Sequence, residues 1–267
     1  MLLLGHFDSV SVDSKLLFKL KPDQKDAFLA SLPDAYRICY ISDRLLIDKA
    51  RANGETPEEF LKYVLPDPGN IMSGDFGELL CFLLSKEFLK NEKSHIGGPR
   101  KWRWKQDRNK PAPHTDILLF RVKDKISKGN HQDDEVIAIE SKMKATKSKS
   151  THPIQDAIDG ADKDRLSRMS KSLDWYNDKL ALDKKPRLRS ILTKFRKPDE
   201  YGTFKKSFKA IAIIDDEFFE EEISKSVSDY SSDIEIWSIS IGQLKEAYEN
   251  VYRQIPNTVI NEPKSAT

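Results

Sequence analysis

Val136-Ile-Ala-Ile-Glu140-Ser-Lys142 is an apolar run that ends in two opposite charges. The apolar residues predict a buried β-strand, and side chains alternate between the two faces of a strand. Glu140 and Lys142 therefore share one face, while Ile139 and Ser141 occupy the other. Charged groups at the end of a buried strand are costly unless they bind a metal, pair with each other or line a cleft. This stretch is the first candidate for a functional site.

A second carboxylate comes from the preceding strand. Residues 115–122 form another nearly continuous apolar run, with Asp116 close to its start. The charged residues 123–134 separate the two runs and predict a hairpin-like connection, so we expect neighbouring antiparallel strands. Asp116 would then lie at the same end of the sheet as Glu140 and Lys142. Two carboxylates at one edge predict a metal site.

The most regular helical pattern covers residues 73–90. Apolar side chains recur there at helical spacing, at Phe76, Leu79, Leu80, Leu83, Leu84 and Phe88. Another face of this helix carries Gly74, Gly77, Glu78 and Cys81. Small residues on that face would let the helix approach a sheet closely, and they would carry Glu78 toward the strands beneath.

The remaining patterns predict a mixed α/β (α+β) fold, with a central mixed sheet flanked by helices. Further strands are expected within residues 1–20 and at 101–105, 208–214 and 234–241, and further helices at 42–51, from 56, at 152–179, 187–195, 218–225 and 244–252. We expect a core over residues 70–254. Residues 1–69 would be an extension packed on the core as a partner-binding surface, and residues 255–267 a flexible tail.

Composition favours a globular protein with a heavily charged surface. Of the 267 residues, 38% are hydrophobic and 33% are charged, and two cysteines, Cys39 and Cys81, are too few for a zinc motif. The apolar opening residues are too few for a signal peptide or a spanning helix, so we expect a cytoplasmic protein without a membrane partner. Basic side chains crowd residues 100–110 and 184–197, as a phosphate backbone would require, although such runs are also typical of a solvated face.

The order of these elements and acids resembles the PD-(D/E)xK nuclease superfamily. Asp116 matches its first acid, Glu140 and Lys142 match the (D/E)xK element, and Glu78 matches the acid often found on its first core helix. The Pro of the name is absent, since His114 and Thr115 precede Asp116. The resemblance implies a restriction-endonuclease-like core that hydrolyses phosphodiester bonds in DNA.

A narrower resemblance is to the HamA family, the nuclease subunits of bacterial Hachiman anti-phage systems. Ser-Gly-Asp-Phe-Gly-Glu-Leu-Leu at 73–80, Thr-Asp-Ile at 115–117, Glu-Ser-Lys at 140–142 and Gln155 carry it. In related nucleases a Gln on the following helix lines the site, and Gln155 has the matching location. The resemblance implies a protein partner, the superfamily 2 helicase HamB, which would restrain the nuclease until DNA damage or phage replication is sensed.

These residue types suit metal-dependent hydrolysis. Mg²⁺, with Mn²⁺ as an alternative, prefers oxygen ligands, which Asp116 and Glu140 would supply with the Ser141 carbonyl. Glu78 would hold a second ion or orient a metal-bound water. Lys142 would position the attacking water or stabilise negative charge in the transition state. Two alternatives stay open, namely a restriction or repair endonuclease of the same fold and a catalytically silent DNA-binding or protein-binding adaptor.

Overall fold

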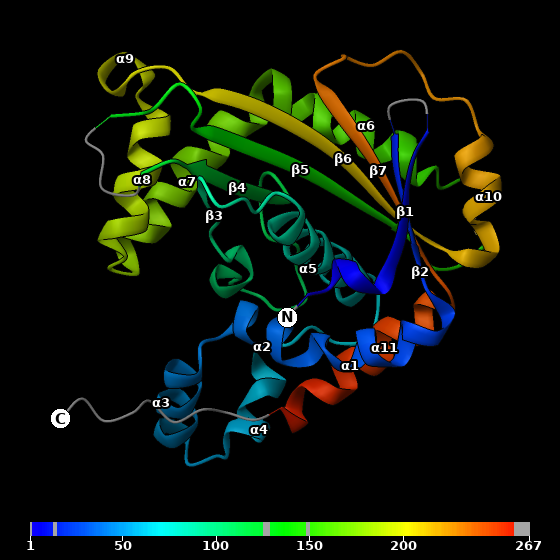
Figure 1. The fold of residues 1–267 in the computed structure, drawn as a ribbon. Coiled ribbons are helices and arrows are strands. Elements are labelled where there is room, and N and C mark those ends of the chain that lie inside the picture. Colours follow the sequence, from blue (N-terminus) through cyan, green and yellow to red (C-terminus); the bar gives the residue numbers. More distant parts are fainter. Residues whose placement is uncertain (1, 13–14, 125–128, 148–149, 259–267) are drawn as a thin grey trace.

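The fold is built on a seven-stranded mixed sheet with helices on both faces (Figure 1). The computed structural model describes residues 2–12, 15–124, 129–147 and 150–258. The strands are β1 (Phe7–Val12), β2 (Lys15–Leu20), β3 (His95–Gly97), β4 (Ile117–Val122), β5 (Glu135–Lys144), β6 (Lys205–Asp215) and β7 (Ile234–Ile241), in the spatial order β1-β2-β7-β6-β5-β4-β3. The predicted mixed α/β class is confirmed.

Strand pairing places the two charged strand ends together, as the sequence predicts. Strands β4 and β5 are antiparallel neighbours, with Ile117 opposite Ile139. Strands β5, β6 and β7 run parallel, and the register sets Glu140 opposite Ala210 and Lys142 opposite Ala212. Because both β6 partners are alanines, only small side chains lie beside Glu140 on the sheet, and a helix can approach it closely.

The sheet separates two hydrophobic cores. One core packs α1 (Lys25–Ala30), α2 (Leu32–Tyr40), α5 (Asn70–Phe88) and α11 (Leu244–Gln254) on one face, and α3 (Asp43–Asn53) and α4 (Pro57–Phe60) extend this layer away from the sheet. The other core packs α6 (Pro153–Lys163), α7 (Met169–Leu182), α8 (Pro186–Arg196) and α10 (Asp216–Ser224), and the short α9 (Pro198–Tyr201) leads into β6. Successive side chains of each central strand point alternately into the two cores, so these strands are apolar on both faces.

Helix α5 lies between the sheet and the outer helices and is buried on several sides, which explains why its apolar residues are not confined to one stripe. Of the two glycines on its predicted small-residue face, Gly77 meets β5, whereas Gly74 is exposed. A Cβ placed on Gly77 would lie 3.4 Å from Ser141 Oγ and 3.6 Å from Met143 Cβ. Because Gly77 lets α5 pack closely on β5, the next residue, Glu78, is held close to the sheet.

Helix α3 begins and ends where the sequence signals predict, and α4 begins at the predicted start but ends early, at Phe60. Helix α3 follows Ser42 and ends at Gly54, whose φ of 69° suits glycine. Helix α4 begins with a complete capping box, in which Thr56 Oγ1 accepts from the Glu59 amide and the Glu59 carboxylate accepts from the Thr56 amide.

Two expectations differ from the structure. Residues 101–105 are not a strand, because Lys101 and Trp102 both turn inward, and Lys101–Trp104 form a 3₁₀ helix, η4. The ordered chain continues past residue 255, since Ile255–Asn257 form a 3₁₀ helix, η6, with Ile255 fully buried. The rest of the expected tail, residues 259–267, lies outside the described residues.

The N-terminal residues also enter the central sheet, because β2 pairs in parallel with β7.

Candidate active site

The Glu140–Lys142 pair lies on the α6 face of β5. Lys142 Nζ is 2.5 Å from Glu140 Oε1, and the side chains are 37% and 5% exposed, so the lysine forms the accessible part of the pair. Helix α6 passes directly over Glu140, where a Cβ on Gly160 would lie 2.3 Å from the Glu140 Cδ. A glycine is therefore required at this point of α6.

Asp116 stands just before the first residue of β4 and contacts β5. Its Oδ2 accepts a hydrogen bond from the Ser141 amide at 3.0 Å. This bond extends the β4–β5 ladder, with a carboxylate oxygen in place of a backbone carbonyl. Ser141 itself points to the opposite face, where its Oγ lies 3.3 Å from Cys81 Sγ. The structure thus brings Asp116 beside the Glu140–Lys142 pair.

Glu78 reaches the same edge from the other face of the sheet, and Lys101 joins it to Asp116. Lys101 Nζ lies 3.1 Å from Glu78 Oε2 and 3.8 Å from Asp116 Oδ1. Trp102 Nε1 donates to the same Glu78 oxygen at 3.0 Å. The two consecutive residues of η4 therefore fix the Glu78 carboxylate.

Arg168, Asp164 and Thr115 complete the cluster, and the sequence did not reveal them. Arg168 Nη2 lies 2.5 Å from Glu140 Oε2, and its Nε lies 2.6 Å from Asp164 Oδ1. Thr115 Oγ1 donates to that Asp164 oxygen at 2.7 Å. Asp164 and Arg168 belong to a π-helical turn, η5 (Asp164–Arg168), between α6 and α7. Such turns are frequent at functional sites, but their hydrogen-bond pattern has no sequence signature.

Gln155 does not join the cluster. Its Nε2 donates to Asp159 Oδ1 at 2.7 Å, and its Oε1 accepts from the Ser228 amide at 2.8 Å. Gln155 instead lines a different hollow with His152 and Glu222, of about 420 Å³. The first turn of α6 thus faces the loop after α10, and only the later Gly160 reaches Glu140.

Like charges crowd the cluster. With every carboxylate ionised, four acids outnumber three bases, namely Glu78, Asp116, Glu140 and Asp164 against Lys101, Lys142 and Arg168. Burial raises the pKa of Glu140, and the Asp116 charge adds to this shift. Burial also raises the pKa of Glu78, again with a contribution from Asp116.

The Lys142 ammonium is held in its charged form. Burial opposes the charge, but Asp116 and Glu140 outweigh burial and raise the pKa of Lys142 above its ordinary value. A lysine that acts as a general base needs the opposite shift. The local charges therefore favour Lys142 as a cation and hydrogen-bond donor.

The donor set fits Mg²⁺. Over the described ranges, no group of three or more His, Cys, Asp or Glu side chains is placed to enclose a metal ion. Mg²⁺ does not require such a cage, because it usually keeps several waters and binds one or two carboxylates together with substrate phosphates. Asp116 and Glu140 would supply two hard oxygen ligands, and the excess of acids over bases in the cluster would favour a cation.

Most of the predicted basic run at residues 100–110 is used inside the protein. Lys101 is buried against Glu78, and Lys105 Nζ lies 2.8 Å from Asp75 Oδ2. Arg103 Nη2 donates to the Ile38 carbonyl at 2.5 Å. These three side chains therefore hold η4 in place and are not available to bind phosphate, whereas Lys110 is exposed.

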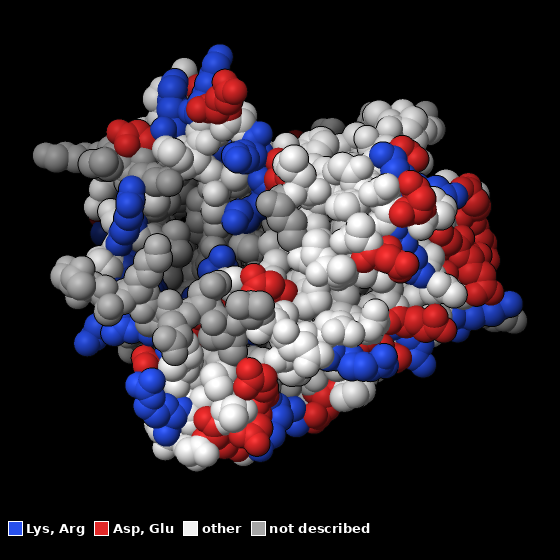
Figure 2. Space-filling view, turned by 60° about the horizontal axis from the view of Figure 1, so that its bottom comes forward, with Lys and Arg blue, Asp and Glu red and all other residues white. Residues whose placement is uncertain are grey.

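The second basic run is split between surface and interior. Lys184, Lys185, Arg187 and Arg189 are exposed at the start of α8, whereas Lys194 is buried and Arg196 pairs with Asp174. Figure 2 shows a dense acidic group at the edge that carries α10, whereas Lys and Arg side chains on the opposite side lie among acidic ones. The exposed bases at the start of α8 are therefore the most basic part of this run.

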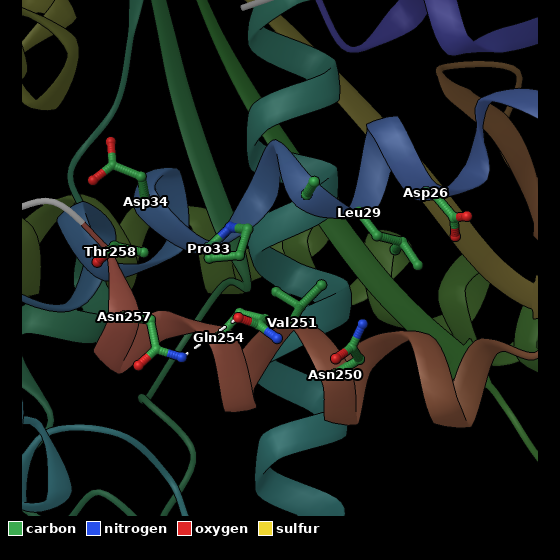
Figure 3. Close-up of a pocket in the computed structure, with 10 residues that line it drawn as sticks. Asp26, Leu29, Pro33, Asp34, Asn250, Val251, Gln254, Asn257 and Thr258 are labelled. Carbon is green, nitrogen blue, oxygen red and sulfur yellow. Dashed lines mark hydrogen bonds between the residues drawn. The ribbon is translucent and has the colours of Figure 1, made fainter.

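A groove of about 620 Å³ lies elsewhere, between α1, α2 and α11 (Figure 3). Its lining mixes apolar side chains such as Leu29 and Val251 with Asp26, Asn250 and Gln254. None of its lining residues belongs to the acidic cluster. The groove is therefore a feature of the outer helical layer and not part of the candidate active site.

Replacing Trp102 by Phe should lower the free energy of unfolding by about 1–3 kcal/mol, because the buried Glu78 carboxylate loses a hydrogen bond. Denaturant unfolding of the purified chain measures the change. Trp104→Phe is the matched control, since Trp104 Nε1 donates at 2.5 Å to the exposed Asp183 carboxylate. The control should cost less than about 1 kcal/mol. Equal losses in the two variants would contradict the role given to the Glu78 bond.

Fold and site together define a mixed α/β protein in which acidic and basic side chains from both layers meet at one edge of the sheet. The family model of HamA matches residues 6–255, and the chain belongs to the HamA family. This membership associates the chain with Hachiman antiviral defence. No curated protein matches the chain. Among the described residues, no helix combines the length and apolar character needed to cross a lipid bilayer.

Proposed function

We propose that this chain is a Mg²⁺-dependent DNA endonuclease and the effector of a Hachiman defence complex. The proposal rests on one observation, the meeting of Asp116, Glu140 and Lys142 at a single edge of the sheet. Lys142 Nζ lies 2.5 Å from Glu140 Oε1, and Asp116 is tied to the intervening Ser141 amide at 3.0 Å. The arrangement supports the proposal, because the PD-(D/E)xK pattern also groups two acids and a lysine.

Asp116 and Glu140 would hold the ion, with the Ser141 carbonyl as a further oxygen ligand. When bound, Mg²⁺ lowers the pKa of a coordinated water and neutralises charge that develops on the phosphate. Arg168 and Lys142 each hold one oxygen of Glu140, so they fix the orientation of this carboxylate. The π-helical turn and Asp164 in turn orient Arg168.

Lys142 would contact the substrate. Its side chain is 37% exposed, against 5% for Glu140, and it therefore lies on the open side of the pair. From this position the ammonium donates a hydrogen bond to the attacking water or to a phosphate oxygen, and it stabilises negative charge in the transition state. Arg168, 26% exposed, offers a second cation on the same side.

The substrate and partner follow from charge and family. The exposed bases at the start of α8 suit a DNA backbone, since each neutralised phosphate releases counterions. Membership of the HamA family supports a superfamily 2 helicase, HamB, as the protein partner. Helices α3 and α4 extend away from the sheet and would offer this helicase a surface within residues 1–69.

The test is cleavage of linear, circular and single-stranded DNA by the purified chain, alone and with its helicase, with and without Mg²⁺. We expect Mg²⁺-dependent cleavage that Lys142→Ala abolishes while folding and DNA binding persist. DNA binding without cleavage under every condition would show an adaptor instead. Cuts confined to one defined sequence would show a restriction enzyme.

A further inference from the structure

We propose that the Lys101 ammonium is a built-in cation that replaces a second divalent ion, so that the active site binds one metal ion and not two. This inference rests on the proposed function and concerns its metal stoichiometry. It arises from the position of Lys101 between two carboxylates, Glu78 on α5 and Asp116 just before β4.

The ammonium has the surroundings of a bound cation. Three oxygens from separate groups face Lys101 Nζ, namely Glu78 Oε2 at 3.1 Å, the Thr115 carbonyl at 3.3 Å and Asp116 Oδ1 at 3.8 Å. The Lys101 side chain is 1% exposed. A buried lysine is rare unless it is paired, and this one is paired with the two acids that would otherwise receive a second ion.

The lysine is also fixed in place. Two anchors hold η4, from which Lys101 projects, and they lie on either side of Trp104. Arg103 Nη2 donates to the Ile38 carbonyl of α2 at 2.5 Å, and Lys105 Nζ lies 2.8 Å from Asp75 of α5. Trp102 Nε1 holds the same Glu78 oxygen as Lys101. The ammonium therefore cannot swing out to admit an ion without disturbing α2 and α5.

Charge balance explains why one ion suffices. Lys101 already pairs with Glu78 and lies close to Asp116, whereas Lys142 pairs with Glu140 and Arg168 is shared between Glu140 and Asp164. A second divalent ion beside Lys101 would bring like charges to within a few ångströms at a buried position. Without Lys101, Glu78 and Asp116 would face each other as two uncompensated carboxylates, which is the usual setting of a divalent cation.

The test is the number of Mn²⁺ ions bound by the full chain without DNA, measured by isothermal titration calorimetry and by electron paramagnetic resonance of free Mn²⁺. We expect one ion for the unmodified chain and two for Lys101→Met. Two ions on the unmodified chain, or one on both proteins, would overturn the inference alone. No Mn²⁺ on either protein would overturn the metal-dependent function and this inference with it.

Two further variants guard against misfolding. Lys101→Met together with Glu78→Gln removes both buried charges, and it should fold and again bind one ion. Lys209→Met is the matched control, because the Lys209 side chain is also buried, at 5% exposed, but pairs with Glu235 of β7 and does not hold η4, and this variant should also bind one ion. If Lys101→Met is unstable without metal, Mn²⁺ should raise its Tm about twice as much as that of the unmodified chain. An equal rise would overturn the inference.

Discussion

Replacing Glu140 by Gln should reduce Mg²⁺-dependent DNA cleavage by about 10³-fold, because the amide keeps the shape of the side chain but loses the charge that binds the ion. The same change leaves Lys142 and Arg168 without their shared anion. Single-turnover cleavage at saturating Mg²⁺ measures the effect on chemistry. Circular dichroism and DNA binding, measured in parallel, should remain close to those of the unmodified chain.

Glu135→Gln is the matched control for this variant. Glu135 begins the same strand, is also buried and pairs with Arg121, but it lies about 16 Å along the strand from Glu140. Its replacement should lower stability and leave the cleavage rate within about threefold, since distant sites act independently. A comparable loss of cleavage in both variants would contradict the assignment of Glu140 to the metal site.

Gly160→Ala should reduce cleavage by about 10²-fold, because a Cβ on this residue would lie 2.3 Å from the Glu140 Cδ and must displace the carboxylate. The collision should also lower the free energy of unfolding by about 1–3 kcal/mol. Cleavage kinetics and denaturant unfolding of the same preparation give both quantities.

Gly74→Ala provides the comparison for the glycine change. Gly74 is also helical, and a Cβ there meets no atom within 4 Å. The Gly74→Ala change should stabilise the chain by about 0.5–1 kcal/mol, because alanine has the higher helix propensity, and it should leave the cleavage rate unchanged. Full activity in Gly160→Ala would show that Glu140 is not held in place by α6, which would remove the structural basis for its role.

The strand alternation predicted the centre of the site. Period-two patterning gave the shared face of Glu140 and Lys142, and the charged connection gave the antiparallel pairing that brings Asp116 beside them. Both predictions use only residues that are close in sequence or lie on consecutive strands, so they can be made from the sequence alone. The structure does place the three side chains together.

The cations around the acids could not be predicted in the same way. Lys101 and Arg168 meet the acids through contacts between segments far apart in the chain, and a single Lys or Arg among 45 basic residues has no distinguishing pattern. The alternating residues 101–105 predicted a strand, but burial of both Lys101 and Trp102 produced a 3₁₀ helix. Gln155 was assigned from its location alone, and the rotation of α6 turns it toward Ser228.

The separation of the two cores by the sheet has a consequence for synthesis of the chain. Glu78 is delivered by the layer that includes α11, near the C-terminal end, whereas Arg168 and the glycine over Glu140 come from the opposite layer. A nascent or half-folded chain, with only one layer docked, would hold an incomplete set of charges. Any hydrolytic activity of this protein would thus require both layers to be docked on the sheet.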